Sequence, residues 1–156
     1  MYTLSETSLK MLKGVHPNLI NFMTELIKIS PWNFKITAGV RTAEEQNRLY
    51  QKGRTAPGAK VTNVDGYKLK SNHQVKFNGL GYATDIGVLV KEKVKVSVVE
   101  NGKKVEKVIE KDIYKGSWKD FHYYQDIYDT AKNAGLLEKY GIEWGGNCWR
   151  TFKDAP

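Results

Sequence analysis

The feature that most constrains the fold of this sequence is a long alternation of apolar and charged residues, KVKVSVVENGKKVEKVIEK, centred on Asn101-Gly102. Alternation with a period of two predicts β-strands, and Asn-Gly between two such runs is a strong signal for a tight hairpin turn. We therefore expect an antiparallel hairpin over about residues 91–112. Because the segment is rich in lysine, we interpret it as a basic insertion on the surface of the protein.

Helical patterns occupy both ends of the chain. A short helix is expected at residues 5–13, and a second helix begins at Pro17, where the missing N–H of proline costs little. Residues 118–134 predict a third helix that stops near Gly135. One face of the second helix is apolar at helical spacing and should pack on a core. Its residues are Leu19, Ile20, Met23, Leu26 and Ile27.

Short β-rich runs separate these helices. Residues 34–40 predict one strand, and residues 142–146 predict a final strand that ends in a glycine turn. At 156 residues the chain has the size of a single domain. We therefore expect an α+β fold, with N-terminal helices packed on a small, mostly antiparallel sheet that carries the hairpin.

A helix with well-defined ends follows the first expected strand. Thr42 and Glu45 have the spacing of a capping box, and Gly53 marks the end of the helix. Arg41 is thereby held between the end of a strand and the start of a helix. A side chain in such a place can be aimed at a ligand.

Composition narrows the partners of the chain. Lys and Arg outnumber Asp and Glu by 25 to 17, a net charge of +8 that favours polyanionic partners such as nucleic acid, anionic lipid or an acidic cell wall. No nucleic-acid motif and no stretch long and apolar enough for a membrane span is present, so we expect neither partner. The first residues do not have the pattern of a secretory signal. The single Cys148 excludes an intramolecular disulfide.

His73 and Asp85 flank a glycine-rich stretch and are candidate metal ligands, although this spacing alone is weak evidence. Their context is more specific. The segments VHPNL, AGVRTAEEQNRLYQKGRT, SNHQ, GYATDI, WGG and KDAP occur in this order over about residues 9–156. This order resembles the M15 family of zinc peptidases, in particular the phage and bacterial L-alanyl-D-glutamate endopeptidases, which are similar to VanY-like D-Ala-D-Ala carboxypeptidases. The resemblance implies a Hedgehog/D-Ala-D-Ala-peptidase-like fold.

The resemblance also implies roles for individual residues. His73 and Asp85 match two zinc ligands of the family, and Arg41 matches the residue that binds substrate and stabilises the developing oxyanion. Asp154 matches the catalytic carboxylate of the final motif, whose histidine is the third zinc ligand. Ser71 and Gln74 are candidates to orient His73 or contact the peptide. Trp144, in the WGG segment, is a candidate for the floor of the substrate cleft.

Two departures from the family pattern stand out. The sequence ends at Pro156, where the next residue of the motif would be the third ligand. We expect a chain truncated just before this histidine; the alternatives are a degenerate, metal-free binding domain, or substitution by His16 or His122. For both histidines a structural role is the preferred interpretation. In addition, eleven residues separate His73 from Asp85, several more than is usual in the family, and we expect an enlarged loop at the rim of the site.

The function that the resemblance implies is zinc-dependent hydrolysis of the L-alanyl-D-glutamate bond in the stem peptide of peptidoglycan, as in an endolysin. Alternatives are a D-Ala-D-Ala or L,D-carboxypeptidase, which trims the last residue of the stem, and an inactive module that binds the cell wall. We expect a monomer made in the host cytoplasm without a signal peptide and acting on the bacterial wall.

Overall fold

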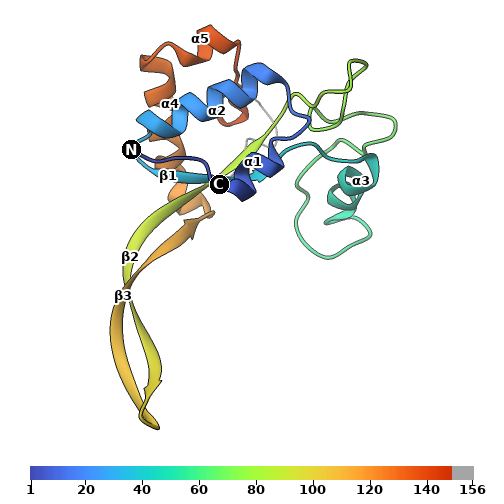
Figure 1. Ribbon diagram of the computed structural model, residues 1–156. Coiled ribbons are helices and arrows are strands. Elements are labelled where there is room, and N and C mark those ends of the chain that lie inside the picture. The colour runs from blue at the N-terminus through green and yellow to red at the C-terminus, as the bar shows by residue number, and fades with distance from the viewer. Residues whose placement is uncertain (149–156) are drawn as a thin grey trace.

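The computed structural model describes residues 1–148 and contains one three-stranded antiparallel sheet. Its strands are β1 (Asn33–Ala38), β2 (Asp85–Glu100) and β3 (Lys103–Lys115), in the order β1-β2-β3. Helices lie at one end of the sheet, and the outer parts of β2 and β3 extend away from them as a twisted arm (Figure 1). The expected α+β fold with an antiparallel sheet is confirmed.

The expected hairpin is also confirmed, and its strands are longer than predicted. β2 and β3 pair without interruption from Val88 and Lys115 to Glu100 and Lys103. The turn between them is Asn101-Gly102, and both residues have positive φ, 48° and 75°. This is the conformation that a tight two-residue hairpin turn requires. The basic arm is therefore a direct continuation of two strands of the sheet.

The helices confirm most of the sequence-based expectations. They are α1 (Glu6–Met11), α2 (Pro17–Ile29), α3 (Ala43–Gln51), the 3₁₀ turn η1 (Trp118–Asp120), α4 (Phe121–Asn133), α5 (Leu136–Tyr140) and α6 (Gly145–Cys148). Pro17 is the first residue of α2, and His16 caps that helix by accepting the N–H of Asn18 at 3.2 Å. Across residues 1–148, none of the helices has the length and apolarity needed to cross a bilayer.

The strand expected at residues 142–146 is wrong. Residues 142–144 have no regular structure, and α6 begins at Gly145. The physical reason lies at the end of α5, where Gly141 adopts a left-handed φ of 65° and the N–H of Ile142 donates to the carbonyl of Leu137. Ile142 and Trp144 pack against the core. Their apolar character therefore reflects packing and not pairing in the sheet.

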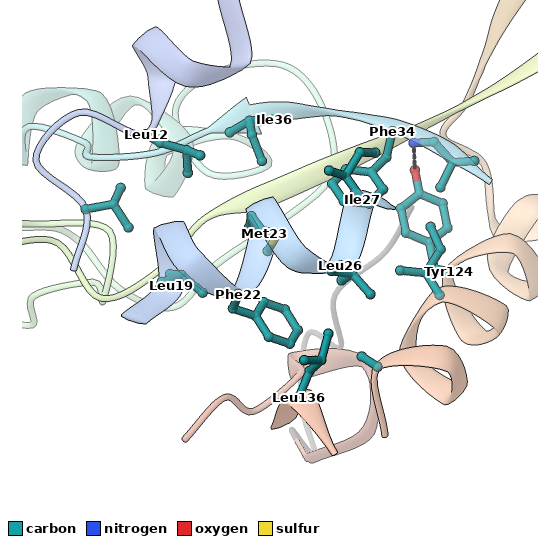
Figure 2. Packing of buried hydrophobic residues seen from close by; sticks show 14 residues of the cluster. Leu12, Leu19, Phe22, Met23, Leu26, Ile27, Phe34, Ile36, Tyr124 and Leu136 are labelled. Atoms are coloured by element: carbon teal, nitrogen blue, oxygen red, sulfur yellow. Dashed lines mark hydrogen bonds between the residues drawn. The ribbon is translucent and has the colours of Figure 1, made fainter. Parts of the chain in front are cut away.

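The core lies between α2, the inner face of the sheet and α4 (Figure 2). Leu26 and Ile27 of α2 are almost fully buried, and Val88 of β2 is completely buried. The hydroxyl of Tyr124, on α4, accepts the N–H of Val88 and donates to the carbonyl of Lys115, so it ties α4 to both long strands. Burial raises the pKa of Tyr124 to about 12, so this phenol stays protonated and able to donate.

Helix α1 fixes the free edge of β1. The Ser8 hydroxyl accepts the N–H of Ile36 at 3.1 Å, and both residues are buried. At the end of β1 the helix approaches so closely that a Cβ on Gly39 would lie 1.9 Å from the carbonyl oxygen of Met11. The backbone just before Arg41 is therefore held by direct contact with α1.

A candidate zinc and peptide site

His73 lies in a loop turn that is closed by its own side chains. The Ser71 hydroxyl accepts the N–H of His73 at 3.2 Å, and the Gln74 amide oxygen accepts the N–H of Ser71 at 2.8 Å. The amide nitrogen of Gln74 donates to the carbonyl of Gly66, and Gln74 is only 5% exposed. Gln74 therefore braces the turn, and Ser71 helps to orient the backbone of His73.

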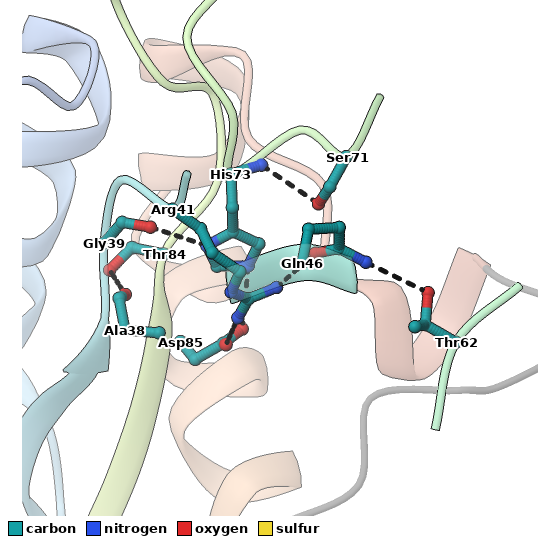
Figure 3. A network of polar contacts seen from close by, with 9 residues as sticks. All are labelled: Ala38, Gly39, Arg41, Gln46, Thr62, Ser71, His73, Thr84 and Asp85. Carbon is teal, nitrogen blue, oxygen red and sulfur yellow. Dashed lines mark hydrogen bonds and ion pairs between the residues drawn. The ribbon is translucent and has the colours of Figure 1, made fainter. Parts of the chain in front are cut away.

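The ring of His73 is oriented by a backbone carbonyl (Figure 3). Its Nδ1 lies 2.8 Å from the carbonyl oxygen of Gly39. A carbonyl oxygen can only accept, so Nδ1 carries the hydrogen and Nε2 of the neutral ring keeps its lone pair. This is the usual arrangement of a metal-binding histidine, whose second nitrogen is held by a carbonyl or a carboxylate.

Asp85 begins β2, opposite Ala38 at the end of β1. A register irregularity between Ile36 and Ala38 lies at this point, and Thr84 donates its hydroxyl to the Ala38 carbonyl at 2.7 Å. The side chain of Asp85 is 44% exposed, whereas that of its neighbour His73 is 11% exposed. The carboxylate therefore has one side on the protein and one side open to a ligand.

Arg41 completes the group. Its backbone N–H donates to the carbonyl of His73 at 2.9 Å, and its Nη2 lies 3.5 Å from Oδ2 of Asp85. Its Nη1 donates to the side-chain oxygen of Gln46 at 2.8 Å. The structure thus brings together Arg41, His73 and Asp85 from three separate segments of the chain, with Ser71 and Gln74 supporting them.

The start of α3 confirms the capping box that the sequence predicts. Thr42 and Glu45 each accept the backbone N–H of the other. The backbone N–H of Thr42 and then its hydroxyl interact with the Glu45 carboxylate and hold the pKa of Glu45 below its ordinary value. Glu45 is therefore charged and engaged at neutral pH. The helix that presents Gln46 to Arg41 has a fixed first turn.

Gln46 is a site residue that the sequence reasoning missed. It is only 2% exposed, and its amide nitrogen donates to the carbonyl of Val64 at 2.9 Å. The available signal was its helical spacing from Leu49 and Tyr50, which places Gln46 on the inward side of α3. A polar residue on an inward face usually has a defined partner, and here Arg41 is one of them.

The extra residues between His73 and Asp85 form an enlarged turn, as expected. The N–H of Lys76 donates to the carbonyl of Leu80, and the N–H of Gly79 donates to the carbonyl of Lys76. At the base of the loop, the N–H of Tyr82 donates to the carbonyl of Asn72 at 2.7 Å. The added length is taken up outside the site, and Phe77 is left fully exposed at the tip.

The donor set fits one edge of a zinc site. Nε2 of His73 and Oδ1 of Asp85 are 3.3 Å apart, longer than an ordinary N–H···O bond. Two ligand atoms on a tetrahedral zinc ion are about 3.4 Å apart, given Zn–N and Zn–O bonds of ~2.1 Å. Within residues 1–148 no group of three or more His, Cys, Asp or Glu residues is placed to hold a metal. Both candidate ligands, His73 and Asp85, lie in this part of the chain.

The two other histidines have structural roles. His16 caps α2, and its ring lies 5.0 Å from that of Tyr82. His122 is exposed on α4, with Nδ1 3.3 Å from the carbonyl of Lys119. These positions agree with the preferred interpretation and give no support to substitution of a zinc ligand by either residue.

Two further candidates lie elsewhere in the chain. Trp144 is stacked on Phe121 at 5.4 Å between ring centroids, and its ring also lies 5.1 Å from that of Tyr128. These ring contacts do not test the contact between Trp144 and substrate that the sequence predicts, so that contact stays a hypothesis. Asp154 lies outside the described residues, so its expected catalytic role also stays a prediction.

Comparison with known proteins places the chain in a family. Residues 1–115, which include Arg41, His73 and Asp85, match the family model of the phage L-alanyl-D-glutamate peptidase. The peptidoglycan L-alanyl-D-glutamate endopeptidase CwlK of Bacillus subtilis (strain 168) is 30% identical over 121 residues, which are 78% of this chain and 56% of CwlK. The chain thus spans little more than half the length of that relative.

A solved structure shares the fold. The crystal structure of Serratia marcescens L-Ala D-Glu endopeptidase ChiX aligns with a TM-score of 0.60 and 22% sequence identity, over 99% of this chain and 86% of ChiX. At this identity the likeness concerns the fold alone. The family match over most of the chain is the decisive finding: the protein belongs to the phage L-alanyl-D-glutamate peptidase family of M15-type peptidases.

Proposed function

We propose that this protein is a zinc-dependent peptidoglycan peptidase that hydrolyses the bond between L-alanine and D-glutamate in the stem peptide. The observation that carries the proposal is the convergence of His73 Nε2 and Asp85 Oδ1 at 3.3 Å, next to the guanidinium of Arg41. This arrangement lies within the part of the chain that matches the family. An endopeptidase is favoured over a carboxypeptidase because the matching family and CwlK are both described by the L-alanyl-D-glutamate bond.

In this proposal His73 and Asp85 would hold the zinc ion, and the third ligand would be the histidine of the family's final motif, to which Asp154 also belongs. A zinc ion held there would polarise the scissile carbonyl and would make water acidic enough to attack near neutral pH. The hydrogen bond from His73 Nδ1 to Gly39 fixes the ring, so that Nε2 faces Asp85 and would be free to bind the ion. The open side of the Asp85 carboxylate leaves room for the substrate.

The remaining side chains handle charge and protons. Arg41 offers guanidinium donors to the oxygen that becomes negative as the carbonyl is attacked, and Gln46 holds those donors in place. Asp154 takes a proton from the attacking water and delivers it to the leaving amine of D-glutamate. Ser71 contacts the peptide near His73, and Trp144 shapes the cleft.

We further propose that residues 1–156 form one peptidase domain that acts as a monomer on the bacterial cell wall. A single hydrophobic cluster that joins α2, β1, β2 and α4 supports the one-domain interpretation. The net charge of +8 favours approach to an anionic wall. Synthesis in the host cytoplasm and release to the wall at lysis, as for an endolysin, complete the proposal.

The test measures zinc content and the new amino termini released from purified peptidoglycan. It uses this chain and a version extended by one histidine after Pro156, each with His73→Ala and, as a matched histidine control, His122→Ala. We expect the extended protein and its His122→Ala form to bind about one zinc and release D-glutamyl amino termini. His73→Ala and treatment with a chelator should each abolish both signals.

Two results would contradict the proposal. Release of free D-alanine without new D-glutamyl termini would identify a carboxypeptidase. Sedimentation with cell walls, without zinc binding or cleavage in either version, would identify a module that only binds the wall.

A further inference from the structure

A groove of about 550 Å³ lies beside the candidate site and is not used by the proposed chemistry. It is lined by the C-terminal part of α1 and the turn that follows it, by the end of β1, and by the side of α3 that carries Glu45, Arg48 and Leu49. Gly39 and Arg41 line the groove and also belong to the candidate site, so the groove and the site are adjacent. The close contact of α1 with Gly39 fixes the two sides of the groove relative to each other.

The groove is cationic. Lys10, Lys13, Arg41 and Arg48 line it, and among residues 1–148 Glu45 is the one acidic residue of its lining. Three of these charges are already engaged, because Arg41 pairs with Asp85 at 3.5 Å, Glu45 accepts the N–H of Thr42, and Arg48 pairs with Glu44 at 2.6 Å.

Lys10 and Lys13 are the free charges of the groove. Within residues 1–148 neither ammonium group has an ion pair or a side-chain hydrogen bond, and both residues are exposed. The backbone N–H of Lys13 donates to the carbonyl of Lys10 at 3.2 Å, so both are attached to the same ordered turn at the end of α1. A ligand with a negative charge would be the first partner of these two side chains.

The chemistry of the cleaved bond supplies such a charge. Glutamate has two carboxyl groups, and only one of them can continue the peptide chain. An L-alanyl-D-glutamyl peptide therefore carries a free carboxylate on the residue directly after the scissile bond, unless that group is amidated. Recognition of this carboxylate would distinguish the glutamyl side of the bond from neutral peptides.

We propose that Lys10 and Lys13 form a subsite for the free carboxylate on the glutamyl side of the substrate. The inference rests on the proposed function, and it assigns substrate preference to α1 and the turn that follows it, a segment that supplies no candidate catalytic residue. Lysines on an exposed groove act as screened point charges, so the preference should weaken as salt is raised.

The test uses two peptides, N-acetyl-L-alanyl-D-glutamyl-alaninamide with the second glutamyl carboxyl free or converted to the carboxamide. We expect the protein extended by one histidine after Pro156, and otherwise unmodified, to favour the acid over the amide by about tenfold in kcat/KM, mainly through KM. The double substitution K10Q/K13Q should remove most of this preference and leave cleavage of the amide unchanged. K103Q/K104Q, which removes the same charge from the exposed turn of the hairpin, should keep the preference.

A second readout separates this inference from the proposed function. Calorimetric titration measures binding of the product D-glutamyl-alaninamide, as acid and as amide, to the unmodified protein and to K10Q/K13Q without any cleavage. If neither peptide is cleaved, the proposed function fails, while weaker binding of the acid to K10Q/K13Q alone still supports the subsite. Equal use of acid and amide by the unmodified protein, or a preference that K10Q/K13Q retains, overturns the subsite.

Discussion

Strand β2 passes through two different environments along its length. From Asp85 to Val90 it lies against the core, with pairing to β1 as far as Leu89 and to β3 from Val88 onward. Beyond Lys91 it pairs with β3 alone, and its residues are exposed or only partly buried. We refer to residues 91–112 as the arm and to the sheet at Asp85–Val90 with its covering helices as the body (Figure 1).

The comparison shows where this fold depends on long-range packing. In the body, a Cβ on Gly87 would lie 2.5 Å from the ring of Tyr114 and 2.7 Å from the side chain of Thr37. At the tip of the arm, a Cβ on Gly102 would meet nothing within 4 Å. The arm is specified by local alternation and its turn, whereas the site end of β2 is specified by neighbours that are distant in sequence.

The largest expected effect is that of Gly39→Ala, which tests packing at the site end. Its Cβ would lie 1.9 Å from a backbone oxygen of α1, so the helix or the end of β1 must move. We expect a loss of more than about 3 kcal/mol in the free energy of unfolding, measured by guanidinium denaturation. Gly102→Ala meets open space and suffers only from its φ of 75°, so it should cost about 1 kcal/mol. Equal losses in the free energy of unfolding at Gly39 and Gly102 would contradict this difference between the body and the arm.

Gln46→Ala should have the next largest effect. The substitution leaves the carbonyl of Val64 and one nitrogen of Arg41 without their partner, which should cost about 2 kcal/mol and reduce peptidase activity. Gln125→Ala is the matched control, since Gln125 on α4 donates only to Asp129 at an exposed position. Its cost should stay within about 0.5 kcal/mol. A similar loss in the free energy of unfolding for both variants would show that Gln46 does not stabilise the site.

A smaller, local effect is expected from acid at the loop that leads to His73. Asp65 accepts the backbone N–H groups of Leu69, Tyr67 and Lys68, and these bonds lower its pKa below the ordinary value of 3.8. The depressed pKa means that the loop is stabilised at higher pH, and this contribution is lost as the pH falls through the folded pKa. Amide chemical shifts of residues 67–69 should report this titration by NMR, and Asp65→Asn should abolish it. Identical titrations in both proteins would contradict the assignment.

Shortening the arm should have the smallest effect. Replacing residues 94–109 by Asn-Gly joins Lys93 to Glu110, which are already paired directly, by a two-residue turn. Because a two-stranded ribbon adds little stability by itself, the free energy of unfolding should change by less than about 0.5 kcal/mol. A loss above about 1 kcal/mol would show that the arm supports the body.

The same contrast explains what could be predicted from the sequence. The hairpin around Asn101-Gly102 and the capping box of Thr42 and Glu45 depend on neighbours within a few residues, so their patterns are legible in the sequence. The family resemblance identified His73, Asp85 and Arg41 as one group. Gln46 was missed because its burial depends on the loop at Val64, which is distant in sequence, although its other partner Arg41 is close.

The wrong strand at residues 142–146 has a related cause. Apolar residues in a short run can face a core with or without pairing in a sheet, and the left-handed Gly141 at the end of α5 decides between the two here. Contacts of this kind depend on the assembled structure.

The most direct test of the central claim is a crystal structure of the histidine-extended protein with zinc, with anomalous diffraction recorded at the zinc edge. The account predicts a single strong peak within about 2.1 Å of both His73 Nε2 and Asp85 Oδ1. A peak at His16 or His122 alone, or no peak between His73 and Asp85 in zinc-saturated crystals, would contradict the assignment of these two residues as zinc ligands.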